Sequence, residues 1–171
     1  MACMYRAAAI VSGLWLLFSP ALAGAAGKPA AVDAARLSAA DREAGDWMSY
    51  GRTYGEQRFS PLSKVNENNI DRLGLAWQFK YDLDRVVEAT PIVVDGVLYT
   101  TSAYSMVCAL DATNGKLLWK YAPEVYRRIQ GSGCCDAANR GVAVWKGRVY
   151  VGVYDGRLVA LDARTGRKAW S

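Results

Sequence analysis

Two stretches of the chain alternate apolar and polar residues in short runs that are bounded by glycine-containing turns. Runs such as VLYTT (residues 97–101) and RVYVG (residues 148–152) have the period of two that is typical of β-strands. The pairs Asn114-Gly115 and Asp155-Gly156 supply residues that readily adopt the positive φ of tight hairpins. The pattern predicts eight strands, at residues 91–94, 97–102, 106–110, 116–121, 142–145, 148–152, 157–161 and 167–170.

The predicted strands form two copies of one unit. Residues 93–120 align with residues 144–171 at a constant offset of 51 positions and without gaps. Both copies carry the string Ala-x-Asp-x-x-x-Gly-x-x-x-Trp, which begins at Ala109 in the first copy and at Ala160 in the second. A four-stranded unit that recurs every ~40–50 residues is typical of a β-propeller blade, so the sequence predicts an all-β propeller fold. Trp77 is expected to close a preceding, partial blade.

The first residues have the composition of a targeting segment. An apolar stretch at residues 7–18 follows Arg6 and precedes the small-residue sequence Ala21-Leu22-Ala23, which predicts a secretory signal peptide over residues 1–23. The stretch is shorter than the roughly 18–20 apolar residues that span a bilayer. We therefore expect an exported chain without stable membrane insertion, and not a transmembrane anchor.

The next segment, residues 24–45, is rich in alanine and contains glycine and proline near its start. This composition predicts a flexible lead-in with a short helix near residues 36–43. The domain itself is expected over residues 46–171.

The chain of 171 residues contains no histidine, and this absence removes several common chemistries. Within these residues it excludes Ser-His-Asp and Cys-His triads, histidine-ligated zinc or copper sites, and the C-x-x-C-H attachment of a c-type haem. The net charge of +5 comes from Lys and Arg that are scattered along the chain. Because no basic patch with interleaved aromatic residues emerges, nucleic acid is not an expected partner.

A polar, glycine-rich loop at residues 131–141 lies between the two repeats. Loops on a rigid scaffold are common places for binding sites. Its adjacent cysteines, Cys134 and Cys135, can bond to each other only through a strained ring. From the residues alone, a mutual disulfide, bonds to other chains and free thiols all stay open. We expect Cys108, on a predicted strand, to be a small buried hydrophobic residue.

The loop segment Gly-Cys-Cys-Asp-x-x-Asn-Arg-Gly-Val-Ala (residues 133–143) resembles the vicinal-disulfide loop of alcohol dehydrogenases that depend on pyrroloquinoline quinone (PQQ). DWMSYGRT (residues 46–53), QRFSPL (residues 57–62) and VEATP (residues 87–91) resemble N-terminal blocks of this family in the same order. The repeated tryptophan string resembles the docking motif of quinoprotein propellers. The resemblance covers residues 46–171.

This resemblance implies an eight-bladed PQQ-binding β-propeller, of which the chain would form about the first three blade units. An open run of blades would expose unpaired strand edges and apolar faces. We therefore expect an N-terminal fragment with an incomplete propeller domain that is inactive alone.

The resemblance also implies roles for four residues. Cys134 and Cys135 would form a disulfide against one face of the PQQ ring. Arg140 would donate charge-assisted hydrogen bonds to the anionic quinone or its carboxylates, and Glu88 would make a polar contact to the cofactor. The residues alone allow two other interpretations, which are an ion pair between Arg140 and Asp136 and an exposed acid at a strand entrance for Glu88.

For the whole enzyme, the resemblance implies that a small primary alcohol is oxidised to an aldehyde in the periplasm by hydride transfer to PQQ. Electrons would pass to cytochrome c, Ca²⁺ or a lanthanide would be bound, and haem c would be present only if a C-terminal cytochrome domain follows. The catalytic Asp and the metal ligands of the family are expected beyond Ser171, so none is assigned in this chain. A PQQ-dependent sugar or polyol dehydrogenase and a noncatalytic propeller scaffold stay as alternatives.

Overall fold

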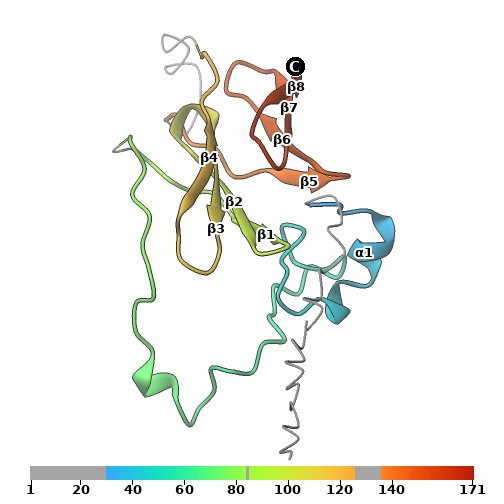
Figure 1. Ribbon diagram of the computed structural model, residues 1–171, viewed down its shortest axis with the longest axis vertical. Coiled ribbons are helices and arrows are strands. Elements are labelled where there is room, and N and C mark those ends of the chain that lie inside the picture. The colour runs from blue at the N-terminus through green and yellow to red at the C-terminus, as the bar shows by residue number, and fades with distance from the viewer. Residues whose placement is uncertain (1–29, 84, 126–135) are drawn as a thin grey trace, which may run out of the picture.

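The computed structural model describes residues 30–83, 85–125 and 136–171, and its strands form two four-stranded antiparallel sheets (Figure 1). In each sheet the strands lie side by side in sequence order, as in a propeller blade. We call the sheets the first and the second blade. The first blade consists of β1 (Ile92–Val94), β2 (Val97–Ser102), β3 (Met106–Asp111) and β4 (Leu117–Tyr121). The second blade consists of β5 (Ala143–Trp145), β6 (Arg148–Gly152), β7 (Leu158–Asp162) and β8 (Lys168–Trp170).

All eight predicted strands are confirmed, and each of their ends lies within one residue of its predicted position. The helical elements are short: α1 (Ala34–Ser38) and the 3-10 turns η1 (Ala40–Arg42), η2 (Ile70–Arg72) and η3 (Ala103–Ser105). α1 begins where Asp33 Oδ1 accepts a hydrogen bond of 2.9 Å from the Arg36 backbone N–H, a side-chain cap that satisfies one of the free amides of the first turn. The helix expected near residues 36–43 is therefore present as α1 followed by η1.

The segment that contains α1 binds to both blades. Lys146 and Gly147, in the β5–β6 turn, donate backbone hydrogen bonds of 2.8 and 2.9 Å to the carbonyls of Val32 and Ala30. Trp47 pairs with Val93 of β1 through two backbone hydrogen bonds of 2.8 and 3.0 Å. Residues 30–45 of the expected lead-in thus pack against the sheets. The predicted signal peptide, residues 1–23, lies outside the described residues, and no helix among those described is long and apolar enough to cross a membrane.

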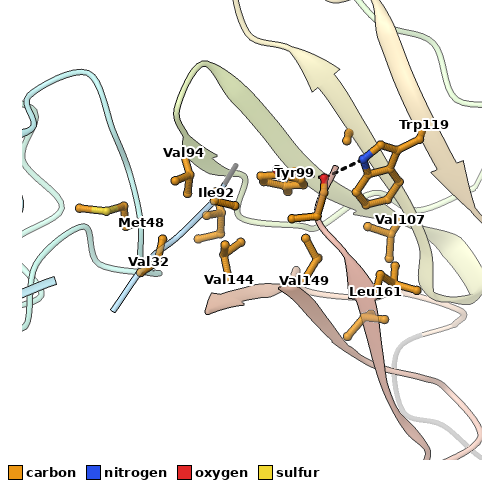
Figure 2. Packing of buried hydrophobic residues seen from close by; sticks show 14 of the residues in the cluster. Val32, Met48, Ile92, Val94, Tyr99, Val107, Trp119, Val144, Val149 and Leu161 are labelled. Carbon is orange, nitrogen blue, oxygen red and sulfur yellow. Dashed lines mark hydrogen bonds between the residues drawn. The ribbon is translucent and has the colours of Figure 1, made fainter. Parts of the chain in front are cut away.

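The first of the two repeated tryptophans, Trp119, docks on the repeat that follows it. Trp119 of β4 is 8% exposed, and its indole Nε1 donates a hydrogen bond of 2.9 Å to the carbonyl of Ala163 (Figure 2). The Gly166 backbone lies directly against the indole: a Cβ atom at this position would be only 2.5 Å from Trp119 Cε3. The motif therefore requires glycine here for close approach as well as for its φ of +69°.

Trp77 makes the same arrangement one repeat earlier. Its Nε1 donates a hydrogen bond of 3.2 Å to the Ala112 carbonyl, and a Cβ atom on Gly115 would be 2.5 Å from Trp77 Cε3. Trp77 is thus the docking tryptophan of a preceding unit, as predicted. The chain before Trp77 runs as an extended segment away from the two sheets (Figure 1), and Phe79 and Tyr81 after it pack against the first blade.

The largest group of buried side chains lies between the two blades and the N-terminal segment (Figure 2). It joins Val94 and Tyr99 of the first blade to Val149 and Leu161 of the second, with Val32 from the N-terminal segment. A smaller cluster of Met106, Cys108 and Leu110 faces the segment that carries Trp77.

Cys108 is 1% exposed and carries a free thiol, which confirms the expectation of a small buried hydrophobic residue. Burial raises the pKa of this thiol to about 11, because a thiolate would lose its solvation there. The thiol is therefore protonated and unreactive at neutral pH.

Candidate functional site

Two of the residues predicted to bind a cofactor, Glu88 and Arg140, lie just before the first strands of the two blades. Glu88 precedes β1 and Arg140 precedes β5. Because β1 and β5 are equivalent strands of adjacent, similarly oriented repeats, the chain enters both blades at the same end. The candidate site therefore lies where the two blades meet, and each blade contributes the segment that precedes its first strand.

The structure brings these two residues together as an ion pair. Arg140 NH1 lies 3.0 Å from Glu88 Oε2, and the two side chains are 69% and 39% exposed. The alternative partner of Arg140, Asp136, instead forms an ion pair with Arg85, with 3.0 Å between Arg85 NH1 and Asp136 Oδ1. Glu88 is an exposed acid at the entrance of β1, as its other interpretation has it, and its carboxylate is paired with Arg140 across the junction between the blades.

The backbone segments that precede β1 and β5 are in direct contact at this junction. The Thr90 N–H donates a hydrogen bond of 3.1 Å to the Arg140 carbonyl. Gly141 has a φ of +128°, and a Cβ atom there would lie 2.9 Å from the Thr90 carbonyl oxygen. Glycine at this position therefore lets the Arg140 strand entrance pass directly against the β1 entrance, which places the Arg140 side chain within reach of Glu88.

The neighbouring β2–β3 connection contains two consecutive residues with positive φ. Tyr104 has a φ of 58° and Ser105 a φ of 60°, a conformation that costs energy for residues other than glycine. Contacts from the second blade and its entrance loop hold this connection in place. The Tyr104 N–H donates to the Ala137 carbonyl at 2.9 Å, and the Tyr154 N–H donates to Ser105 Oγ at 3.1 Å.

Sequence reasoning assigned no role to Asn139, although it lies in the segment that carries the resemblance. Its side chain and carbonyl make hydrogen bonds to both blades and to the backbone of the loop. The local signal for one of these bonds is an asparagine two residues before a glycine, a spacing that favours an Asx turn. The other bonds join segments that are distant in sequence, so no local pattern indicates them.

Cys134 and Cys135, the other two predicted cofactor contacts, lie outside the described residues, and their disulfide stays a prediction. Within residues 30–83, 85–125 and 136–171, no group of three or more Cys, Asp and Glu side chains is placed to hold a metal ion. The described part of the site is thus an exposed guanidinium, a carboxylate that it neutralises, and the loop that carries them.

Comparison with known proteins adds family information to this geometry. Residues 47–171 match the family model described as PQQ: glucose/ethanol/alcohol dehydrogenase, β-propeller domain. The quinohemoprotein alcohol dehydrogenase ADH-IIG of Pseudomonas putida is 60% identical over 166 residues, which are 97% of this chain and 23% of that protein. Its solved structure superposes with a TM-score of 0.82 at 64% identity, over 84% of this chain and 21% of that one.

Two further similar proteins are named for other alcohols. The 1-butanol dehydrogenase (cytochrome c) of Thauera butanivorans is 52% identical over 74% of this chain and 18% of its own length. The structure of a europium-containing methanol dehydrogenase superposes with a TM-score of 0.73 at 36% identity, over 80% of this chain and 24% of that one. The chain thus spans about a fifth of the length of the relatives that it matches.

Proposed function

The chain belongs to the PQQ family of glucose, ethanol and alcohol dehydrogenase β-propeller domains, and from this premise we propose that it supplies two blades and part of the cofactor site of a PQQ-dependent alcohol dehydrogenase. The observation that carries the proposal is the Glu88–Arg140 ion pair, which spans the two blades at the entrance of their first strands. The reaction proposed for the whole protein is the oxidation of a primary alcohol to the aldehyde.

The described residues fit an anionic cofactor. PQQ carries carboxylates, and a guanidinium presents several N–H donors in a planar fork that suits such groups. Arg140 uses NH1 to contact Glu88, while 69% of its side chain stays exposed. The guanidinium therefore has accessible surface for a second carboxylate.

Glu88 would disfavour an anionic cofactor if its charge were uncompensated. Its contact of 3.0 Å with Arg140 compensates that charge. The carboxylate is 39% exposed, so it can also accept a hydrogen bond from an N–H or O–H group of the ligand. The pair thus offers a donor and an acceptor side by side, which orients a ligand that carries both kinds of polar group.

The remaining parts of the proposal concern residues and regions that the structure does not describe. We assign Cys134 and Cys135 to a disulfide against one face of the cofactor, on the resemblance of their loop. Bound PQQ would supply a quinone that accepts hydride from the alcohol carbon, with Ca²⁺ or a lanthanide as Lewis acid. Cytochrome c is the proposed electron acceptor. The periplasm is the proposed location, based on the apolar stretch at residues 7–18.

Cofactor titration of the full-length protein tests this function. We expect Arg140→Ala to weaken PQQ binding by about 10- to 100-fold, because a charge-assisted hydrogen bond contributes about 1.5–3 kcal/mol. Arg58→Ala is the matched control, since Arg58 forms an exposed pair with Glu56 at 3.6 Å outside the site. Fluorescence quenching measures PQQ affinity, and dye reduction with primary alcohols measures turnover.

Three outcomes would contradict the proposal in different ways. Tight PQQ binding with turnover of sugars or polyols but not of primary alcohols would indicate the other substrate class. Absence of PQQ binding by the unmodified protein would indicate a noncatalytic propeller. Equal affinities of the Arg140→Ala and Arg58→Ala variants would remove Arg140 from the cofactor site.

A further inference from the structure

We propose that Asn139 is a positioning residue for the cofactor: it ties the loop of residues 136–141 to both blades and thereby holds the Arg140 guanidinium in its binding orientation. This inference rests on the proposed function, because it assigns a role to Asn139 within that site. It concerns a residue that acts through Arg140 and does not itself contact the ligand.

The Asn139 side chain uses both kinds of hydrogen-bonding group that an amide offers. Its Nδ2 donates to Ser105 Oγ at 3.1 Å and to the Gly152 carbonyl at 2.9 Å. Its Oδ1 accepts from the Gly141 N–H at 3.1 Å. Two donors and an acceptor are thus all engaged, which fixes the orientation of the amide plane.

These partners belong to different parts of the molecule. Ser105 lies in η3, between β2 and β3 of the first blade, and Gly152 ends β6 of the second blade. The Asn139 carbonyl adds a third tie, since Thr101 Oγ1 of β2 donates to it at 3.2 Å. Asn139 therefore fastens its own loop to the same end of both blades.

The Ser105 partner is itself held rigidly. Its side chain is buried, with the residue 1% exposed, and its Oγ also accepts a hydrogen bond of 3.1 Å from the Tyr154 N–H. Its φ of 60° is a conformation that surrounding contacts must maintain. The amide of Asn139 is thus anchored to a fixed point and not to a mobile surface group.

The same contacts fix the backbone on both sides of Arg140. The Asn139 carbonyl accepts from Thr101, the Arg140 carbonyl accepts from the Thr90 N–H at 3.1 Å, and the Gly141 N–H is bound by Asn139 Oδ1. The direction in which the Arg140 side chain leaves the backbone is therefore set. An exposed arginine loses much side-chain entropy when it binds a ligand, and a fixed backbone reduces this cost by pre-organising the donor.

Two substitutions distinguish the local hydrogen bond of Asn139 to Gly141 from its hydrogen bonds to the two blades. Asn139→Asp keeps an oxygen for the Gly141 N–H, but it loses both donors and places a carboxylate beside the Gly152 carbonyl. Asn139→Ala removes all the side-chain hydrogen bonds. Asn114 is the matched control, because its Oδ1 accepts from the Lys116 N–H at 2.9 Å in an equivalent local turn between β3 and β4.

The experiment is a double-mutant cycle in the full-length protein, with PQQ affinity measured by fluorescence quenching. We expect Asn139→Asp and Asn139→Ala to weaken PQQ binding by about 10- to 50-fold. Asn114→Asp should leave the affinity within about 2-fold of the unmodified protein. In the Arg140→Ala background, Asn139→Asp should cause less than about a 2-fold further loss, because its effect passes through Arg140.

The outcomes separate this inference from the function on which it rests. If the unmodified protein fails to bind PQQ, the proposed function is wrong and the inference falls with it. If the unmodified protein binds PQQ and Asn139→Asp binds equally well, the inference alone is wrong. Additive losses in the cycle would also overturn it, because a purely structural role weakens the site whether or not Arg140 is present. Ser105→Ala, which removes the anchor in the first blade, replaces Asn139→Ala if that variant does not fold.

Discussion

Trp119 and Trp170 occupy the same position in the two blades, opposite Ala109 and Ala160 in the antiparallel register. Each lies against a tyrosine of its own blade, with ring centroids 5.9 Å apart for Trp119 and 6.0 Å apart for Trp170. Their exposures nevertheless differ, at 8% and 45%. The contacts that bury Trp119 come from Ala163 and Gly166 of the following repeat. The interface between blades, which we call the seam, is thus formed by the tryptophan of one blade and by the Ala and Gly residues of the next.

The turns that join the first two strands of each blade show a second difference. Both have consecutive residues with positive φ, at 52° and 76° for Asp95-Gly96 and at 47° and 75° for Lys146-Gly147. Asp95 binds the N-terminal segment through its carboxylate. Its Oδ2 accepts a hydrogen bond of 3.0 Å from the Ala30 N–H, and its Oδ1 lies 3.0 Å from Arg36 NH2. Lys146 binds the same segment through its backbone N–H. The first turn is thus held by the Asp95 side chain together with its backbone N–H, which donates to Asp46 Oδ1 at 3.1 Å, whereas the second is held by main-chain bonds.

The largest expected effect tests whether the neighbouring repeat makes the difference between the tryptophans. In the 171-residue chain, Trp119→Ala should lower the free energy of unfolding by about 3–5 kcal/mol, because it leaves a cavity at the seam. Trp170→Ala should cost about 1 kcal/mol, because that indole is already half exposed. Urea unfolding followed by far-UV circular dichroism measures both. Equal losses would show that burial within each blade dominates.

A smaller effect is expected from the glycines that face the indoles. Gly166→Ala places a Cβ atom 2.5 Å from Trp119 and should cost about 2–4 kcal/mol, from overlap together with the positive φ. Gly156→Ala is the matched control, since its φ is +89° and nothing lies within 4 Å of an added Cβ atom. The control should lose only about 1 kcal/mol in the same urea unfolding assay. A loss as large in the control would mean that backbone strain, and not contact with tryptophan, selects glycine in the motif.

The smallest expected effect concerns the two turns. Asp95→Ala removes an acceptor for the Ala30 N–H and one partner of Arg36, and it should lower the melting temperature by a few degrees, equivalent to about 1 kcal/mol. Lys146→Ala keeps the backbone bond to Val32 and should change stability by less than about 0.5 kcal/mol. Differential scanning fluorimetry compares the two variants. A larger loss for Lys146→Ala would show that its side chain, and not its backbone, holds that turn.

The strands could be predicted closely because their signals are local. Alternation with a period of two and turn residues such as Gly96 and Gly147 indicate hairpins without reference to distant parts of the chain. The docking role of Trp77 was also accessible, because Trp77 lies 42 residues before Trp119, a spacing within the ~40–50 residues of a propeller blade. The ion pair between Glu88 and Arg140 was not predicted as a pair, although the resemblance named both residues. Its partners come from loops before two different strands, and only the packing of the blades brings these loops together.

The amino-acid sequence by itself determined the elements, the repeat and the residue types of the seam, since a small residue, a glycine and a tryptophan at regular spacing leave few other ways to pack. Tertiary structure alone decided which residues share the site. Asn139 reaches Ser105 and Gly152 because the entrance of the second blade lies against the ends of β2 and β6. Hydrogen bonds act over about 3 Å, so they depend on final positions in space, and no local pattern in the sequence specifies those positions.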